Sequence, residues 1–195
     1  MSIDIKLVSE IREVTGAGMV DVKNALEEAG GGKDAAIDLL CKKGVIKAAK
    51  KAGRATKEGL VHAYIHSNQK SGALVEVWCE TDFVARTDAF KELSHNIAMH
   101  IVASNPLYLL AADISEAEIE KEKSLQREIL KNDGKPKEII EKILEGKMQK
   151  FYADFCLLEQ PYIKDDKITV GDLLKQNIAL LGENIEIKRF ARFAM

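Results

Sequence analysis

Hydrophobic residues in the first part of the chain recur with the spacing of amphipathic helices. Three short stripes occupy residues 1–44, and the glycine-containing segments 15–18 and 30–32 separate them. We expect Asp34 to cap the third helix and Gly44 to end it in the left-handed conformation. The stripes consist of Leu7, Val8, Ile11 and Val14, then Met19, Val22, Leu26 and Ala29, then Ile37, Leu40 and Cys41. The pattern predicts a compact three-helix domain.

The hydrophobic period changes to two at residues 59–80. Two alternating runs flank the segment "NQKSG", whose composition is typical of a turn. One face of the first run carries Val61, Ala63 and Ile65, and one face of the second carries Ala73, Val75, Val77 and Cys79. Leu74 and Trp78 fall on the opposite face, which we expect to be partly covered. The alternation predicts a β-hairpin.

Two further helical regions follow the hairpin. A stripe of Phe90, Leu93, Ile97 and Ile101 predicts a helix to about Ser104, with His100 as a hydrogen-bonded core residue. Residues 113–152 predict a charged helical hairpin. Its sequence signals are a capping box at Ser115 and Glu118, Pro136 at the second helix start, and a stripe of Ile140, Leu144, Met148 and Phe151.

The last segment predicts one more helix and one more strand. Leu173, Leu174 and Ile178 share a helical face, and Ile185, Ile187 and Phe193 share strand parity. If this strand joins the hairpin, the fold class is α+β, with a small three-stranded antiparallel sheet packed with helices. The predicted parts are a three-helix domain (1–44), a basic linker (45–58), an α+β core (59–112 and 153–195) and a protruding helical-hairpin arm (113–152).

Charge is balanced over the whole chain but not locally. There are 29 basic and 31 acidic residues among 195, which gives no general attraction to nucleic acid or to acidic membranes. Residues 42–57, however, contain seven basic residues and no acidic one. Such a run is either a solvated linker or a contact for RNA or an acidic protein. No aromatic residue is interleaved for base stacking, which weakens the RNA interpretation.

The motifs of covalent chemistry are missing from the sequence. It contains no phosphate-binding loop, no dinucleotide fingerprint and no nucleophile elbow. Its three cysteines are widely spaced, and His62 and His66 lie about 13 Å apart along a strand, too far for one metal. We therefore expect a binding protein without cofactor or metal. The first residues lack a signal or transit pattern and no apolar stretch is long enough for a membrane, so we expect a cytoplasmic protein.

The segment "CETDFVARTDAF" at residues 79–90 places a carboxylate and a large aromatic ring at a strand-to-helix junction. One interpretation is packing: Phe83 lies seven residues before Phe90 and extends its stripe, while Thr81 or Asp82 caps the helix. The other is a projection that inserts into another protein. The residues alone favour packing.

Several stretches occur in the same order as in bacterial elongation factor Ts, which the chain resembles over essentially its whole length. The most specific is "TDFVA" after the strand "VEVWCE". The others are "IREVTGAGMVDVKNALEEAGG", "GVIKAAKKAGRATKEGLV", "NIAMHIVASNP", "GKPKEIIEKILEGKMQKF" and "GENIEIKRFARF". Only one half-core precedes the arm, as in the short form of the family, which works as a homodimer.

The resemblance implies a translation factor that accelerates nucleotide exchange on the GTPase elongation factor Tu, without enzymatic chemistry and without direct nucleic-acid contact. It implies a ubiquitin-associated (UBA)-like N-terminal domain and a coiled-coil arm. Thr81, Asp82, Phe83 and Val84 would insert near the nucleotide site and help to displace Mg²⁺. On the N-terminal domain, Arg12, Met19 and Lys23 are the expected docking residues, unless they are only surface or core positions.

Two other classes remain open at this point. One is an RNA- or ribosome-associated protein that uses the basic run at residues 42–57. The other is a UBA-type adaptor whose core has only a structural role.

Overall fold

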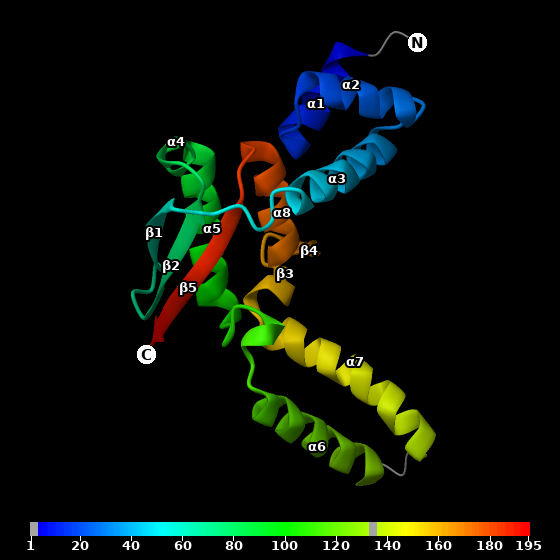
Figure 1. Cartoon of the computed structure of the whole chain (residues 1–195), viewed down its shortest axis with the longest axis vertical. Coiled ribbons are helices and arrows are strands. Elements are labelled where there is room, and N and C mark those ends of the chain that lie inside the picture. Colours follow the sequence, from blue (N-terminus) through cyan, green and yellow to red (C-terminus); the bar gives the residue numbers. More distant parts are fainter. Residues whose placement is uncertain (1–3, 133–135) are drawn as a thin grey trace. The chain divides into compact units, whose positions relative to one another are not determined.

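The computed structural model describes residues 4–132 and 136–195 of the chain (Figure 1). Helices and strands are mixed, with a three-stranded sheet, a two-stranded sheet and eight α-helices in these residues. Two compact units are each built from separate segments. The first consists of Met1–Leu60, Val77–Leu93 and Leu174–Glu186, and the second of Val61–Glu76, Ser94–Leu173 and Ile187–Met195. The predicted α+β class is confirmed.

Three helices open the first unit, as predicted. They are α1 (Ile5–Thr15), α2 (Met19–Glu28) and α3 (Lys33–Ala49). Asp4 caps α1 by accepting a hydrogen bond from the Lys6 amide, and Gly16 ends it with a φ of 65°. Their common core consists of Val8, Ile11, Val22, Ala25, Leu26, Ala36 and Leu40.

Several details of the predicted three-helix domain are wrong. Helix α3 continues through Gly44 to Ala49, because Gly44 does not adopt a positive φ and the following residues include good helix formers. The N-cap of α3 is Gly32, and Asp34 lies in the first turn, where a carboxylate still favours the helix dipole. Val14 (68% exposed), Met19 (51%) and Cys41 lie on the surface instead of in the core.

The three-stranded sheet consists of β1 (Glu58–Ile65), β2 (Ser71–Cys79) and β5 (Ile185–Ala194) in the order β1-β2-β5. The face formed by Ala73, Val75, Val77 and Cys79 is buried, as the alternation predicts. Within the second unit, helix α5 (Asp88–Ser104) lies against the sheet (Figure 1), where the His62 ring contacts His95 and the Arg192 side chain donates a hydrogen bond to the Val102 carbonyl oxygen (3.2 and 3.1 Å). Phe90, Leu93, Ile97 and Ile101 of α5 are all buried, so the predicted stripe is confirmed.

The sequence predicts that Ile185, Ile187 and Phe193 of β5 lie on one face of the sheet, and this holds only for the first half of the strand. Ile187 is buried, but Phe193 is 67% exposed. Arg192 reaches the helix side of the sheet, which an unbroken alternation from Ile187 would not allow. The alternation therefore shifts by one residue between these positions, and Phe193 lies on the outer face.

The second unit contains two long helices packed against each other, α6 (Glu116–Asn132) and α7 (Lys137–Phe155). The capping box is confirmed, because Ser115 Oγ accepts from the Glu118 amide and Glu118 Oε2 from the Ser115 amide (3.3 and 3.2 Å). Pro136 is the N-cap of α7, and part of the predicted chain break, residues 133–135, lies outside the described residues. Ile140, Leu144 and Met148 are buried, while Phe151 is half-buried.

The short helix η1 (Ala111–Asp113) lies between α5 and α6. The elements between α7 and β5 are η2 (Leu157–Glu159), β3 (Pro161–Tyr162), β4 (Asp165–Thr169) and α8 (Val170–Leu181). The β3–β4 pair has no signal in the sequence pattern, since a strand of two residues is too short to show alternation. His100 is buried and its Nε2 contacts Gln160 Oε1 at 2.9 Å, which confirms its core role.

Candidate partner-binding site

The segment that joins β2 to α5 forms a tight and well-defined turn. Thr81 has extended backbone angles and caps the single-turn helix α4 (Asp82–Ala85), with its Oγ1 accepting from the Val84 amide (3.5 Å). Thr87 Oγ1 donates to the Val84 carbonyl oxygen (2.8 Å) and accepts from the Phe90 amide (3.2 Å). Two threonine hydroxyls therefore bind the backbone amide and the backbone carbonyl of Val84. We call residues 81–84 the Thr81–Val84 turn.

Phe83 is 80% exposed, so the packing interpretation of this residue is wrong. The helical structure is interrupted between α4 and α5, so the Phe83 ring does not continue the stripe that begins at Phe90. The capping part of that interpretation is correct, because Thr81 is the N-cap. Among the described residues, Phe83 is the most exposed phenylalanine.

Asp82 adds a negative charge beside the exposed ring. Its carboxylate forms an ion pair with Arg86 at 2.9 Å, one helical turn further on. Both side chains are substantially exposed, so the pair contributes little to stability. The carboxylate is accessible for a cation or a hydrogen-bond donor of a partner.

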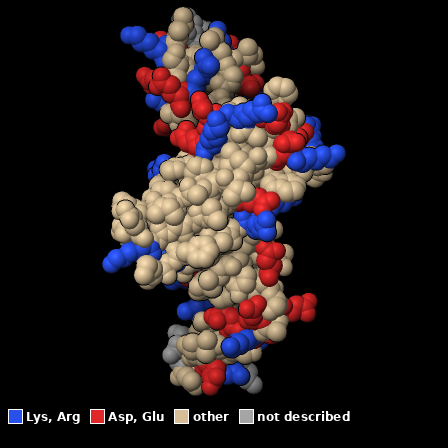
Figure 2. Space-filling view, turned by 90° about the vertical axis from the view of Figure 1, so that its left-hand side faces the viewer, with Lys and Arg blue, Asp and Glu red and all other residues tan. Residues whose placement is uncertain are grey.

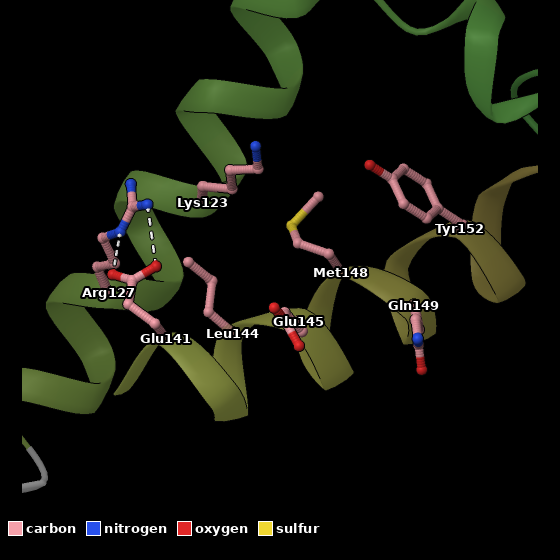
Figure 3. Close-up of a pocket in the computed structure, with 8 residues that line it drawn as sticks. All are labelled: Lys123, Arg127, Glu141, Leu144, Glu145, Met148, Gln149 and Tyr152. Atoms are coloured by element: carbon pink, nitrogen blue, oxygen red, sulfur yellow. Dashed lines mark hydrogen bonds and ion pairs between the residues drawn. The ribbon is translucent and has the colours of Figure 1, made fainter. Parts of the chain in front are cut away.

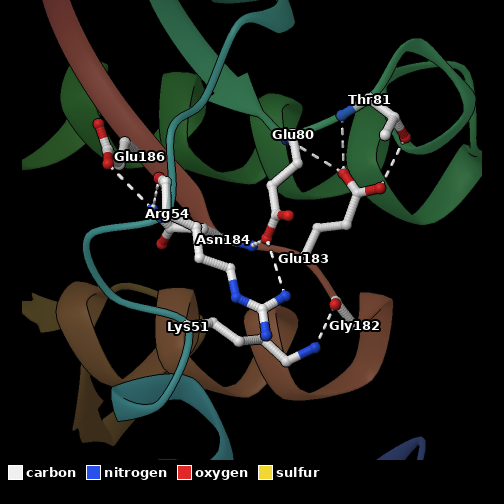
Figure 4. A network of polar contacts seen from close by, with 8 residues as sticks. All are labelled: Lys51, Arg54, Glu80, Thr81, Gly182, Glu183, Asn184 and Glu186. Atoms are coloured by element: carbon white, nitrogen blue, oxygen red, sulfur yellow. Dashed lines mark hydrogen bonds and ion pairs between the residues drawn. The ribbon is translucent and has the colours of Figure 1, made fainter.

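Glu183, far away in the sequence, holds the start of the turn (Figure 4). Its Oε2 accepts hydrogen bonds from the amides of Glu80 and Thr81 (3.1 and 3.0 Å), and its Oε1 accepts from the Thr81 hydroxyl (2.6 Å). The Cys79 thiol donates to the Thr81 carbonyl oxygen (3.1 Å). Burial, followed by the nearby Glu183 charge, raises the pKa of Cys79 to about 11, so this thiol keeps its proton at neutral pH.

A second set of contacts anchors the loop that carries Glu183. The Asn184 amide donates to Glu80 Oε1 (2.7 Å), and its side-chain Nδ2 donates to the Arg54 carbonyl oxygen (2.9 Å). Arg54 also lies 3.6 Å from the Glu80 carboxylate, and Lys51 Nζ donates to the Gly182 carbonyl oxygen. The sequence pattern places Arg54 in a linker, Glu80 at the end of a strand and Asn184 in a turn. It does not predict their contacts, because these join segments more than 100 positions apart.

The predicted docking residues of the N-terminal helices are all exposed. Arg12 lies in the last turn of α1, Met19 begins α2, and Lys23 lies one turn further along. Two more exposed apolar side chains occur on these helices, Val14 (68%) and Val20 (70%). The core interpretation is therefore wrong for these three residues. They belong to α1 and α2, while the Thr81–Val84 turn is a separate element.

Four cations of the basic run have acceptors within the chain. Lys43 pairs with Glu28 (2.5 Å) and Lys47 with Asp21 (2.9 Å), besides the contacts of Lys51 and Arg54. The carboxylates that pair with Lys43, Lys47 and Arg54 reduce the attraction of the run to a polyanion, whereas the acceptor of Lys51 is an uncharged carbonyl.

A groove of about 420 Å³ lies between α6 and α7 (Figure 3). Leu144 and Met148 are its buried apolar residues, and Arg127 donates two hydrogen bonds to Glu141 across it (3.0 and 3.3 Å). This contact lowers the pKa of Glu141. The groove combines apolar and paired charged residues, and no nucleophile–base pair is among the residues that line it.

Among residues 4–132 and 136–195, no group of three His, Cys, Asp or Glu side chains is arranged to hold a metal ion. His62 Nε2 contacts His95 Nδ1 (3.2 Å), while His66 contacts the Tyr64 hydroxyl. In the same part of the chain, no helix is long and apolar enough to cross a membrane.

Comparisons with known proteins identify the family of the chain. The family model for elongation factor TS matches residues 34–195. Elongation factor Ts of Fervidobacterium nodosum is 55% identical over 192 residues, which cover 98% of both chains. The protein of the same name from Nitratidesulfovibrio vulgaris is 54% identical over all 195 residues and 98% of its own length. On this evidence, the chain belongs to the elongation factor Ts family of translation elongation factors.

Proposed function

We propose that this protein is the guanine nucleotide exchange factor of elongation factor Tu. It binds the GDP form, loosens Mg²⁺ and GDP, and stays bound to the nucleotide-free GTPase until GTP enters. The observation that carries the proposal is Phe83, which is 80% exposed on a turn that hydrogen bonds hold in place. The protein itself forms and breaks no covalent bond.

The proposed mechanism is differential binding. GTPases hold GDP with backbone donors around the phosphates and with a bound Mg²⁺. An inserted Phe83 ring repacks the elements beside that site, and the Asp82 carboxylate competes for nearby cations or donors. Binding is reciprocal, so a factor that weakens GDP binding is itself bound less tightly in the presence of GDP.

The N-terminal helices provide the second contact in this proposal. Arg12, Met19 and Lys23 are exposed and combine two positive charges with an apolar side chain, which suits an amphipathic surface of the GTPase. In family terms, we propose that α1–α3 form the UBA-like domain and that α6 and α7 form the coiled-coil arm. The residues after α3, including Lys51 and Arg54, position the turn relative to its supporting loop.

We also propose that the protein works as a homodimer in the cytoplasm. The outer face of the sheet in the second unit carries the exposed side chains of Val61 (66%), Ile65 (66%), Leu74 (44%) and Phe193 (67%). Figure 2 shows a broad area with few charged side chains on this side of the molecule. An apolar patch of this kind on a soluble protein favours a protein–protein contact. A second copy would cover the same face by twofold symmetry.

The two other classes differ in their predictions. An RNA-binding protein requires the cations of residues 42–57, but four of them already have acceptors within the chain. An adaptor requires residues 1–52 alone to bind the partner fully.

The test is the release of fluorescent GDP from elongation factor Tu. Full-length protein should accelerate release strongly and residues 1–52 should not, whereas equal activity of the fragment, or none of the full chain, contradicts the proposal.

A further inference from the structure

We infer that Glu183 is a positioning residue for the Thr81–Val84 turn and fixes the direction in which Phe83 is presented. This inference rests on the proposed exchange function. Glu183 does not belong to the turn and follows it by 100 residues in the sequence. Its role is to hold the turn that touches the partner GTPase.

The Glu183 carboxylate accepts several strong hydrogen bonds from the start of the turn. One carboxylate accepts two backbone amides, Glu80 and Thr81, and the Thr81 hydroxyl (3.1, 3.0 and 2.6 Å). Hydrogen bonds to a charged acceptor are roughly twice as strong as neutral ones. They restrain the backbone at the point where the chain leaves β2 and enters α4.

The Thr81 hydroxyl has a single proton, and Glu183 determines where it points. That proton points to Glu183 Oε1, so the lone pairs of Oγ1 are available to accept from the Val84 amide. Glu183 therefore sets the rotation of the hydroxyl that caps α4. A helix of one turn has little intrinsic stability, and its geometry depends on such a cap.

The loop that carries Glu183 is itself held in place by hydrogen bonds on both sides of this residue. Asn184 is 3% exposed and donates to the Arg54 carbonyl oxygen and to Glu186 Oε1 (2.9 and 3.0 Å). Lys51 donates to the Gly182 carbonyl oxygen on the other side of Glu183 (Figure 4). The loop can therefore act as a fixed support.

These contacts imply a separation of roles between docking and exchange. Phe83 makes few contacts of its own, so its direction depends on the backbone that carries it. Loss of Glu183 should leave Arg12, Met19 and Lys23 able to dock. It should lower the maximal rate of GDP release, because the turn then spends less time in the productive conformation.

The test is the rate of fluorescent GDP release from the partner GTPase, measured against the concentration of this protein. For Glu183→Ala we expect the maximal rate to fall about tenfold, the equivalent of one strong hydrogen bond. The half-saturating concentration should change less than about threefold, because docking is retained. Glu159→Gln, an exposed glutamate outside the network, is the matched control and should behave as wild type.

Thr81 variants provide the second half of the test. Thr81→Val keeps the shape but removes the hydroxyl, and should lower the maximal rate as Glu183→Ala does. Thr81→Ser keeps the hydroxyl and should lower the rate less than Thr81→Val does. The double variant Glu183→Ala/Thr81→Val should lose no more than either single variant, since the two groups act together. Should Glu183→Ala fail to fold, Glu183→Gln retains an acceptor for the backbone amides and should show a smaller loss.

The possible results separate this inference from the function on which it rests. If Phe83→Ala loses release while Glu183→Ala keeps the wild-type rate, the positioning role is overturned and the exchange function stands. If the wild-type protein does not accelerate release, the exchange function fails. Amide hydrogen exchange in the free protein then decides the positioning role: Glu183→Ala should speed exchange at Glu80 and Thr81, and unchanged exchange overturns it.

Discussion

Phe83 and Phe90 lie seven residues apart in the sequence, yet Phe83 is 80% exposed and Phe90 is fully buried. The difference arises at Thr87, whose hydroxyl accepts from the Phe90 amide and separates α4 from α5. One ring therefore belongs to the core, while the other is available to a partner. The exchange mechanism proposed for this family member depends on this separation.

The close contact between α1 and α8 predicts a steric limit at Gly16. This residue has a φ of 65°, and an added Cβ would lie 2.6 Å from Leu180 Cδ1. Gly16→Ala should lower the free energy of unfolding by about 1 kcal/mol from backbone strain, with a smaller addition because the 48% exposed Leu180 side chain must move aside. Urea denaturation measures the loss.

Gly30 provides a matched control for the same experiment. It also has a positive φ (62°), but an added Cβ would meet nothing within 4 Å. Gly30→Ala should therefore lower the free energy of unfolding only by the backbone strain, about 1 kcal/mol. Equal losses for the two variants would contradict the steric contribution of Leu180.

His100 predicts a dependence of stability on pH. Burial lowers its pKa below the usual 6.5, although the hydrogen bond that His100 Nε2 donates to Gln160 Oε1 acts in the opposite direction. The unfolded chain therefore binds a proton at a higher pH than the folded chain does. Stability should fall as the pH drops below about 6.5, down to the folded pKa, and no further contribution is lost below that.

Denaturation midpoints between pH 5 and 7.5 test this expectation. His100→Gln should be less stable at neutral pH, because buried hydrogen bonds are disturbed, but its stability should depend less on pH. His62→Asn is the necessary comparison, since burial and the neighbouring His95 also lower the pKa of His62. An unchanged pH slope in His100→Gln would exclude His100 as the source.

The outer face of the sheet predicts the oligomeric state. Ile65→Lys places a charge in the proposed interface and should weaken the dimer at least about tenfold, because an unpaired charge is costly to bury. Sedimentation at micromolar concentration should show a dimer for the wild type and a monomer for the variant. Leu125→Lys, at a 50% exposed position of α6, is the control. A monomeric wild type would contradict the homodimer.

The parts of the fold with a regular local pattern were predictable from the sequence. The buried face of β2 and the stripe of α5 follow from periods of two and 3.6, and the capping box at Ser115 marked the start of α6 correctly. Gly44 shows the limit of local signals. A glycine after two lysines is typical of a helix end, but here the helix continues past it.

The candidate site was predictable only in part. The exposure of Phe83 depends on the break between α4 and α5, and Thr87 followed by Asp88 was a usable signal for a new helix start. The sequence carries no comparable signal for the contacts of Glu183. Its partners Glu80 and Thr81 are more than 100 residues away, and only the folded chain brings the three together.

The most direct test of the account is Phe83→Ala in the assay of GDP release from elongation factor Tu. Because the ring is 80% exposed, the variant should keep the wild-type free energy of unfolding within about 0.5 kcal/mol. A central aromatic contact typically contributes about 2 kcal/mol, so the stimulated rate should fall roughly 30-fold. A folded Phe83→Ala that releases GDP at the wild-type rate would contradict the central claim.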